Sequence, residues 1–481
     1  MKIRKILPIA MLLLVAAVAA SCLGDNEDVV YTDDTAITSF SLGTLNVIHH
    51  TTSSTGEDST YTSTLDCSDY VFYIDQSTST VYNPDSLPVG TDASKALVTV
   101  GTQNSGYAYL KSLKSDSVTY ISSSDSLDFS EPRTVIVYSN SGLQQRSYSV
   151  HVNVHQEVAD SFHWTQTATV ELFKQMTGMK AVATQDQVTV FGCVGGTTVA
   201  VASTDGGTTW RQCTFSFNHT LAADAYQGVV VKDNYMYLID GNSIIRSKDA
   251  STWETVATTT QLKQLVAASS ARFYAYATDG RLMASADGCQ TWTACTLDDE
   301  LSLLPTESLS YVCTSLRTNS GAERLLLLGN RNAQTYASDT HAIVWGKIDE
   351  TDASAQEQPW SYFDVNSQNR RAIPRLGNLQ ATAYDDGVAI IGGASLGGKT
   401  RNAFDSVYVS RDAGITWIGD TTLCAPADFV AAIDSTATAP VFGFTSDSNN
   451  FLWIISGTDG KVWKGRINRL GWCKEQTSFT E

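Results

Sequence analysis

Six cationic side chains stand in three short segments of the second half of the chain, and these segments contain no Asp or Glu. In a chain with a formal net charge of −18, this is a marked local asymmetry. Arginine forms paired hydrogen bonds with carboxylate, sulfate or phosphate groups, so the segments predict a surface that binds an anionic ligand. The alternative is that the cations pair with acids elsewhere in the chain or stay solvated. The six residues are Arg331, Arg370, Arg371, Arg375, Lys399 and Arg401.

Other signs of site chemistry are few. No HExxH motif, nucleotide-binding loop or Ser-His-Asp motif occurs in the sequence. His151 and His155 would share a face of a strand, but a metal site would need His163 as a third ligand, and exposed strand histidines are the simpler interpretation. We therefore predict no metal and no cofactor.

A recurring octet with the pattern S-x-D-x-G-x-T-W marks the elements that must position these segments. It is intact at 203–210 and 410–417, has one change at 285–292, and is shortened at 247–253. Ser and Asp side chains can accept hydrogen bonds from a turn, Gly permits a positive φ, and Trp buries a large apolar area. The Asp and Trp residues of the four copies are Asp205 and Trp210, Asp249 and Trp253, Asp287 and Trp292, and Asp412 and Trp417.

This octet resembles the Asp box of sialidase-like β-propellers. The resemblance implies that each Asp fastens a turn and has no catalytic role, since copies spread around a ring cannot converge on one substrate. It also implies that the boxes lie on the face opposite the binding or active site. Because the octet joins the third and fourth strands of a blade, the segments with the six cations would open on that opposite face.

The repeating units predict a propeller of six blades, or alternatively seven, over residues 160–481. Most strand triplets precede a fourth strand that bears a Trp, including Trp360 and Trp472 in the units without an octet. A further strand around Trp164 would close the ring by joining the last blade. The triplets begin near Lys180, Ala225, Leu265, Ser308, Leu379 and Pro440.

Residues 36–157 carry no octet and read as strands separated by turn residues. In Val150–Val154 three valines alternate with polar side chains, which is typical of a strand with one buried face. The segment predicts a β-sandwich. It resembles the Ig-like modules found near the anchor of Bacteroidetes surface lipoproteins, so the expected fold class is all-β: an Ig-like sandwich followed by a propeller.

The first residues read as an export signal. A basic start precedes a 15-residue apolar run, which is too short for an ordinary membrane span. Small residues before Cys22 resemble the lipobox of bacterial lipoproteins, which implies a signal peptide at 1–21 and a lipid on Cys22. Residues 22–35 form an acidic tether, similar to the surface-export signal of Bacteroidetes lipoproteins. We expect attachment to the outer membrane by this lipid alone, with display on the cell surface; the periplasmic face is the alternative.

Composition narrows the classes of function. An acidic chain lacks the basic excess that nucleic-acid binding requires. Beyond Cys22 eight cysteines remain, and none forms a C-x-x-C pair. Cys193 could bridge to Cys213 and Cys289 to Cys295, although scattered free thiols are the favoured interpretation.

The resemblance to sialidases does not extend clearly to their chemistry. The stretch Arg371 to Pro374 is an imperfect echo of that family's Arg-Ile-Pro motif, and it follows three octets instead of preceding the first. No Tyr–Glu nucleophile pair can be nominated. We therefore predict a monomeric, non-catalytic surface protein whose propeller face binds a glycan or protein ligand. The alternative is a glycoside hydrolase or lyase acting on acidic glycans, with catalytic residues that the sequence does not identify.

Overall fold

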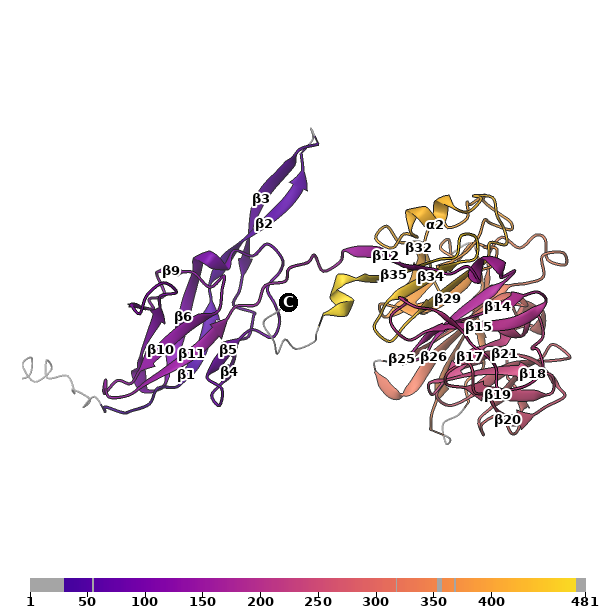
Figure 1. The fold of residues 1–481 in the computed structure, drawn as a ribbon, viewed down its shortest axis with the longest axis horizontal. Helices are drawn as coiled ribbons and strands as arrows, with labels where there is room; N and C mark the ends of the chain where they lie inside the picture. The colour runs from indigo at the N-terminus through magenta and orange to yellow at the C-terminus, as the bar shows by residue number, and fades with distance from the viewer. Residues whose placement is uncertain (1–29, 54–55, 317, 353–356, 367–368, 473–481) are drawn as a thin grey trace, which may run out of the picture. The chain divides into compact units, whose positions relative to one another are not determined.

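The computed structural model describes residues 30–53, 56–316, 318–352, 357–366 and 369–472. They form two compact units, 30–158 and 159–472, each built mainly of β-strands (Figure 1). Cys22 and the signal region lie outside the described residues. Within the described ranges, no helix combines the length and the apolar character needed to cross a membrane.

The N-terminal unit has two sheets around one core. Their strand orders are β1-β6-β9 and β4-β5-β11-β10-β7-β8, and only the β5–β11 pairing among them is parallel. A separate hairpin, β2–β3, extends from the unit (Figure 1). The strands are β1 (Ile37–Leu42), β2 (Thr44–Thr52), β3 (Asp58–Asp66), β4 (Tyr73–Asp75), β5 (Thr80–Tyr82), β6 (Ala96–Thr102), β7 (Tyr107–Lys111), β8 (Val118–Tyr120), β9 (Ser126–Leu127), β10 (Arg133–Tyr138) and β11 (Gln145–His151).

The core of this unit follows from alternation along the strands. In β10 the side chains of Val135 and Val137 are fully buried, whereas Tyr138 on the other face is partly exposed. Phe40 of the smaller sheet belongs to the same apolar cluster. The expectation of a β domain before the propeller is therefore confirmed.

The described residues of the second unit form six four-stranded antiparallel sheets. In five of them the four strands are consecutive along the chain. These sheets are β13 (Met179–Ala183), β14 (Val188–Val194), β15 (Thr197–Ser203) and β16 (Arg211–Gln212); β17 (Val230–Lys232), β18 (Tyr235–Asp240), β19 (Ser243–Ser247) and β20 (Glu254–Thr258); β21 (Leu262–Ala268), β22 (Phe273–Ala277), β23 (Leu282–Ser285) and β24 (Thr293–Ala294); β25 (Glu307–Leu316), β26 (Asn319–Asn330), β27 (Ile343–Glu350) and β28 (Ser361–Tyr362); and β29 (Gln380–Tyr384), β30 (Gly387–Ile391), β31 (Tyr408–Ser410) and β32 (Ile418–Gly419).

The remaining sheet joins the two ends of this unit. It contains β33 (Phe442–Ser446), β34 (Leu452–Ser456) and β35 (Lys461–Ile467), and its fourth strand is β12 (Phe162–Thr169) from the start of the unit. The strand around Trp164 thus joins the last sheet, as expected. Trp472 does not form a strand: it follows the short 3-10 helix η6 (Asn468–Gly471), because β12 already occupies the outer edge.

The first strands of the six sheets surround a central axis. Each contacts the first strand of the next sheet, and β33 contacts β13, so the ring is closed. Strands 1 and 3 of an antiparallel sheet run in the same direction. The turn between strands 3 and 4 therefore lies at the end of the ring opposite the starts of the first strands. We call the end where the first strands begin the entry face.

The four octets form four equivalent turns between third and fourth strands. In the first, the Asp205 carboxylate accepts hydrogen bonds from the backbone N–H and the hydroxyl of Thr209, at 2.9 and 2.6 Å. The Ser203 hydroxyl accepts from the N–H of Gly207, whose φ is +87°. A Cβ on Gly207 would lie 2.5 Å from the ring of Trp453, so both φ and space require glycine there.

The octet carboxylates hold their turns as ionised acceptors. Hydrogen bonds from the hydroxyl and N–H of Thr209 lower the pKa of Asp205 to about 2, and Thr291 does the same for Asp287. In each copy the Trp side chain folds back on the turn: Trp210 Nε1 donates to the Gly207 carbonyl at 3.1 Å. These contacts give the four aspartates a structural role.

Candidate functional site

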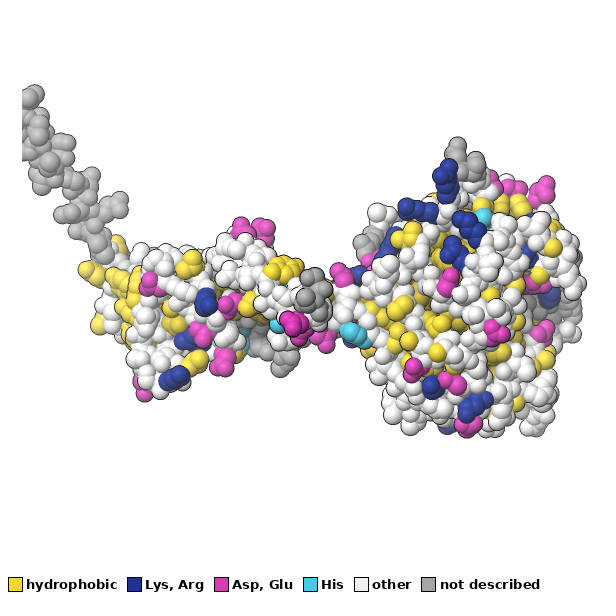
Figure 2. Space-filling view, turned by 90° about the horizontal axis from the view of Figure 1, so that it is seen from above, with side chains coloured by type: hydrophobic (Ala, Val, Ile, Leu, Met, Phe, Trp, Pro, Cys, Tyr) yellow, Lys and Arg dark blue, Asp and Glu magenta, His cyan; other side chains and the backbone are white. Residues whose placement is uncertain are grey.

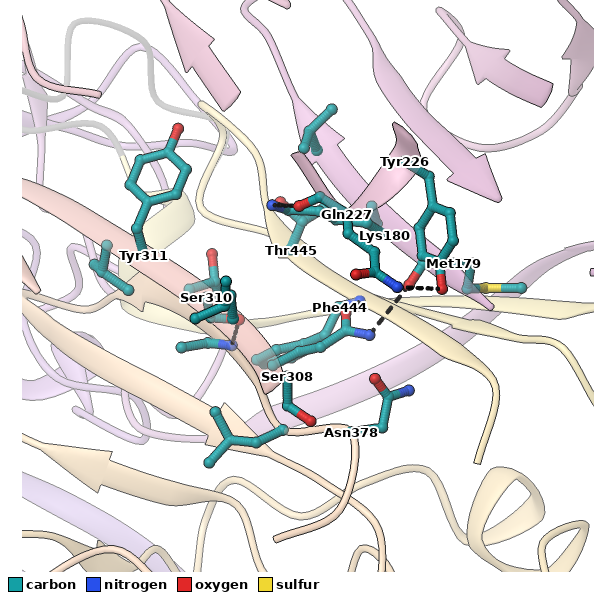
Figure 3. A pocket seen from close by; sticks show the side chains of 18 of the residues that line it. Met179, Lys180, Tyr226, Gln227, Ser308, Ser310, Tyr311, Asn378, Phe444 and Thr445 are labelled. Atoms are coloured by element: carbon teal, nitrogen blue, oxygen red, sulfur yellow. Dashed lines mark hydrogen bonds between the residues drawn. The ribbon is translucent and has the colours of Figure 1, made fainter. Parts of the chain in front are cut away.

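The inner strands of all six sheets line a cavity of about 850 Å³ along the axis of the ring. Figure 3 shows the part of this cavity where the first strands begin. Its walls combine backbone with uncharged hydroxyl and amide side chains, among them Gln227, Ser308, Ser310 and Asn378. A cavity at the centre of a ring, lined by rigid strands, is a common position for a ligand site.

Lys180, on β13, is the cationic side chain at the entry face of this cavity. Its Nζ donates a hydrogen bond to the Gln227 carbonyl oxygen at 3.0 Å, and Figure 3 shows the two residues side by side. Burial lowers the pKa of Lys180 to about 8. No Asp or Glu of the described ranges forms an ion pair with it, so Nζ keeps donor capacity for a ligand.

Two residues at the same end of the cavity have strained backbones. Ser308 near the start of β25 has φ +51°, and Asn378 just before β29 has φ +45°. Left-handed backbone at a residue other than glycine costs on the order of 1 kcal/mol and gathers at functional sites. Asn378 Nδ2 donates to the Pro440 carbonyl at 2.6 Å, which holds the side chain at the cavity wall.

The η4 segment (Ala225–Gly228) completes the entry face. Tyr226 lies against Gly178, where a Cβ would come within 2.1 Å of the phenol oxygen. Gln227 Nε2 donates to the same phenol oxygen at 3.3 Å. We call the set of Lys180, Tyr226, Gln227, Ser308 and Asn378 the channel mouth.

The carboxylates that line the cavity already have partners. Glu307 accepts from Asn332 Nδ2 at 2.7 Å, and Glu323 accepts from the N–H of Ser270 at 2.6 Å. Asp233 lies 3.6 Å from the ammonium group of Lys232. Each of these three acids therefore has a local structural partner.

Two of the six cations singled out in the sequence support loops. Arg331 forms a two-pronged ion pair with Asp339, at 2.8 and 2.6 Å, and this contact raises the pKa of Arg331. Arg375 is 1% exposed, and its guanidinium donates to the carbonyl oxygens of Tyr336 and Arg331 at 2.8 and 2.9 Å. The guanidinium group of Arg331 is thus bound by an acid, and that of Arg375 by loop carbonyl oxygens. The sequence pattern did not predict either contact.

The other four cations divide between two places. Arg370 and Arg371 lie beside the octet turn of the fifth sheet, where the Trp417 N–H donates to the Arg371 carbonyl. Lys399 and Arg401 belong to the β30–β31 connection, at the entry face, and Arg401 lies over the ring of Tyr408. The structure therefore does not bring the six cations together.

Positive charge is still concentrated on part of the propeller surface. Figure 2 shows Lys and Arg side chains grouped there, with acidic side chains among them.

Sequence reasoning missed Lys180 as a site residue. The available signal was a single Lys inside the otherwise apolar first strand of a repeat.

The seven cysteines of the described ranges are free thiols, so neither Cys193–Cys213 nor Cys289–Cys295 forms a bridge. This agrees with the favoured interpretation of the sequence. Burial raises the pKa of Cys289 and Cys295 to about 12, which makes their thiolates scarce near neutral pH.

Family models match both units. A model described as the DUF6242 beta propeller domain matches residues 158–475, and one described as the DUF6242 N-terminal domain matches residues 40–152. The chain belongs to the DUF6242 family. This DUF6242 protein thus has an N-terminal β domain followed by a β-propeller with several four-stranded blades. It has no match among curated proteins.

Solved structures resemble this DUF6242 protein only distantly. A Trichoderma reesei carbohydrate-active enzyme of family AA12 has 13% identity and a TM-score of 0.39, covering 64% of this chain and 97% of that chain. An auxiliary nutrient binding protein from Bacteroides thetaiotaomicron has 6% identity and a TM-score of 0.39, covering 76% and 93%. YCF48 from Cyanidioschyzon merolae has 15% identity and a TM-score of 0.32, covering 63% and 98%. Similarity at this level assigns no function.

Proposed function

We propose that the propeller is a non-catalytic binding module whose channel mouth holds an acidic sugar of a glycan. The observation that carries the proposal is the Lys180 ammonium group, which faces uncharged hydrogen-bonding groups and has no acid partner among the described residues. A half-buried ammonium favours a ligand that brings a negative charge, such as the carboxylate of a uronate or sialate.

The neutral neighbours suit the rest of a sugar. Gln227, Ser308 and Asn378 offer amide and hydroxyl groups, which can exchange hydrogen bonds with the hydroxyls of a pyranose ring. The inner strands hold these groups at fixed positions, which limits the conformational entropy lost when a ligand binds. Lys399 and Arg401, on the same face, are candidates for contacts with a longer glycan.

The positions of the two glutamates argue against Glu307 and Glu323 as a hydrolytic pair. Glu307 pairs with Asn330, near the start of β25, and the partner of Glu323 is Ser315, near its end. At about 3.3 Å per residue, their backbones are separated by roughly 20 Å or more. Paired glycosidase carboxylates are usually within about 10 Å. These two acids therefore do not suit the hydrolase alternative.

The proposal includes the finer features of the fold. The ring has six blades, the octet turns are Asp boxes, and the N-terminal domain is an Ig-like sandwich. The closed circuit of inner strands supports the first assignment, and the repeated Ser, Asp and Trp contacts support the second. Two sheets that share one core support the third.

The proposal also places the protein on the cell surface, held by a lipid on Cys22. Replacing Cys22 with Ala should release the protein from the membrane fraction, because one residue would carry the entire anchor. Fractionation and mass spectrometry of the N-terminal peptide check this. A wild-type protein that is soluble and carries no acyl group would remove this part of the proposal.

Replacing Lys180 with Met should weaken binding of an acidic glycan by roughly tenfold or more, since hydrogen bonds to charged groups contribute about 1.5–3 kcal/mol. A glycan array with paired acidic and neutral sugars identifies the probe, and calorimetric titration measures its affinity. Lys248→Met removes an exposed lysine of the shortened octet, at the opposite end of the ring, and should leave affinity unchanged. Binding to neutral glycans alone, or equal affinity in Lys180→Met, would refute the proposal.

A further inference from the structure

Four tyrosines on three adjacent strands share one part of the outward face of the larger sheet in the N-terminal domain, and Tyr73 and Tyr82 lie on the same face beyond β11. Tyr107 and Tyr109 lie on β7, Tyr138 on β10 and Tyr120 on β8. Tyr138 is directly opposite Tyr107, and Tyr120 is directly opposite Tyr109. Direct cross-strand partners point to the same face, as do residues two apart on a strand. We call these four residues the tyrosine platform.

Three of the four rings of the platform are in contact, and Tyr107 lies on the strand position opposite Tyr138. The ring of Tyr109 lies 5.5 Å from that of Tyr138 and 5.6 Å from that of Tyr120, with interplanar angles of 88° and 73°. Tyr107 and Tyr120 are 51% and 53% exposed. The opposite face of the same strands packs in the core of the domain. Packing between neighbouring strands explains the contacts between the tyrosine rings. It does not explain why the rings of Tyr107 and Tyr120 are so exposed to solvent.

The outward positions of the neighbouring strands are almost free of charge, and the acids nearest the Tyr107–Tyr138 end, Asp33 and Asp34, are hydrogen-bonded to Ser141 and Asn104. The outward side chains of the neighbouring strand β11 are Gln145, Ser147 and Ser149, all exposed, and His151, which is half-buried. At the outward positions of β7, β8, β10 and β11, all of which the structure describes, Lys111 is the one Lys, Arg, Asp or Glu. Its Nζ lies 2.9 Å from Asp116, which neutralises it.

This charge pattern selects one class of partner. A cationic or anionic partner finds no opposite charge on the platform, although the chain as a whole is strongly acidic. A neutral sugar suits both the tyrosine rings and the polar side chains of β11. The C–H face of a pyranose ring packs on a tyrosine ring, and the sugar hydroxyls reach the amide and hydroxyl groups of β11. Tyrosine also loses little conformational entropy on binding, since its side chain has two rotatable bonds.

We infer that the tyrosine platform is a second glycan-binding surface, one that takes uncharged sugar rings. It differs from the channel mouth in position and in ligand charge. The two surfaces give one chain two independent means of holding polysaccharide, and either can fail without the other.

Native gels containing a soluble neutral polysaccharide test this inference on the full chain. The probes are an α-glucan, a β-glucan and a galactomannan, and the measured quantity is the retardation of the protein. At least one probe should retard the wild type. Tyr107→Ala with Tyr120→Ala should reduce the apparent affinity tenfold or more, and Tyr120→Ala alone should reduce it less.

Two controls separate the platform from general effects. Tyr61 on the β2–β3 hairpin is 57% exposed, so Tyr61→Ala removes a comparable ring elsewhere and should leave retardation unchanged. Lys248→Met, which removes an exposed lysine of the propeller outside both surfaces, should also leave it unchanged. If the double variant unfolds, Tyr120→Ala on the outer strand β8 decides, because it removes one exposed ring. The inference is overturned if no probe retards the wild type, or if a folded platform variant is retarded as strongly as the wild type.

Discussion

Replacing Asp349 with Ala should lower the free energy of unfolding of the propeller by about 3–5 kcal/mol. Asp349, on β27, is fully buried and accepts hydrogen bonds from Ser269 Oγ at 2.5 Å, from Tyr274 Oη at 2.9 Å, and from Arg272. Ser269, Arg272 and Tyr274 belong to the neighbouring sheet, so one carboxylate joins two sheets. Its removal leaves a largely buried guanidinium without its counter-charge.

Urea unfolding, followed by tryptophan fluorescence, measures the effect. Asp279→Ala is the matched control, because Asp279 forms an exposed ion pair with Arg281 and should cost less than about 1 kcal/mol. Asp349→Asn should fall between the two, since its amide oxygen can still accept hydrogen bonds but the side chain carries no charge. A loss of less than about 1 kcal/mol in Asp349→Ala would contradict the assigned role.

Trp417→Ala should destabilise the propeller by about 3–5 kcal/mol, and Trp210→Ala by less. Both belong to intact octets and make the same hydrogen bond to their turn. Trp417, however, is 4% exposed within an apolar cluster between neighbouring sheets, whereas Trp210 is partly exposed. Sequence alone treats the two as equivalent, and burial separates them.

Thermal unfolding of the two variants under the same conditions tests this ranking. The melting temperature should fall further for Trp417→Ala. Equal shifts would show that the hydrogen bond to the turn, which both share, outweighs the apolar area that only Trp417 buries fully.

The repeated architecture could be predicted from sequence because its signals are local. An octet fixes its own turn through contacts within eight residues, as in the bonds from Ser203 to Trp210. The strand around Trp164 was also predicted correctly to join the last sheet. A ring of sheets needs one more strand at the open edge of its last sheet, and this strand supplies it. Trp472 was misplaced because the same edge admits one strand only.

The site could not be predicted in the same way, because it depends on contacts between distant residues. In the sequence, Arg331 and Arg375 both look free to bind a ligand. In the structure, Asp339 folds against Arg331, and backbone carbonyl oxygens surround Arg375. Lys180 contacts η4, and the other groups at this end of the cavity come from the starts of β25 and β29, all of which lie far away along the chain. Neither the composition of the chain nor the spacing of its residues predicts that such distant residues come together.

The pH dependence of acidic-glycan binding tests the channel-mouth proposal most directly. Because burial lowers the pKa of Lys180 to about 8, the ammonium group is lost as pH rises through that value, and affinity should fall between about pH 7 and 9. Lys180→Arg keeps its charge throughout and should bind with little pH dependence, whereas Tyr226→Phe removes the other ionisable group of the mouth and should retain the wild-type profile. Affinity that stays constant to pH 9.5 in the wild type, or that falls equally in Lys180→Arg, would contradict the proposal.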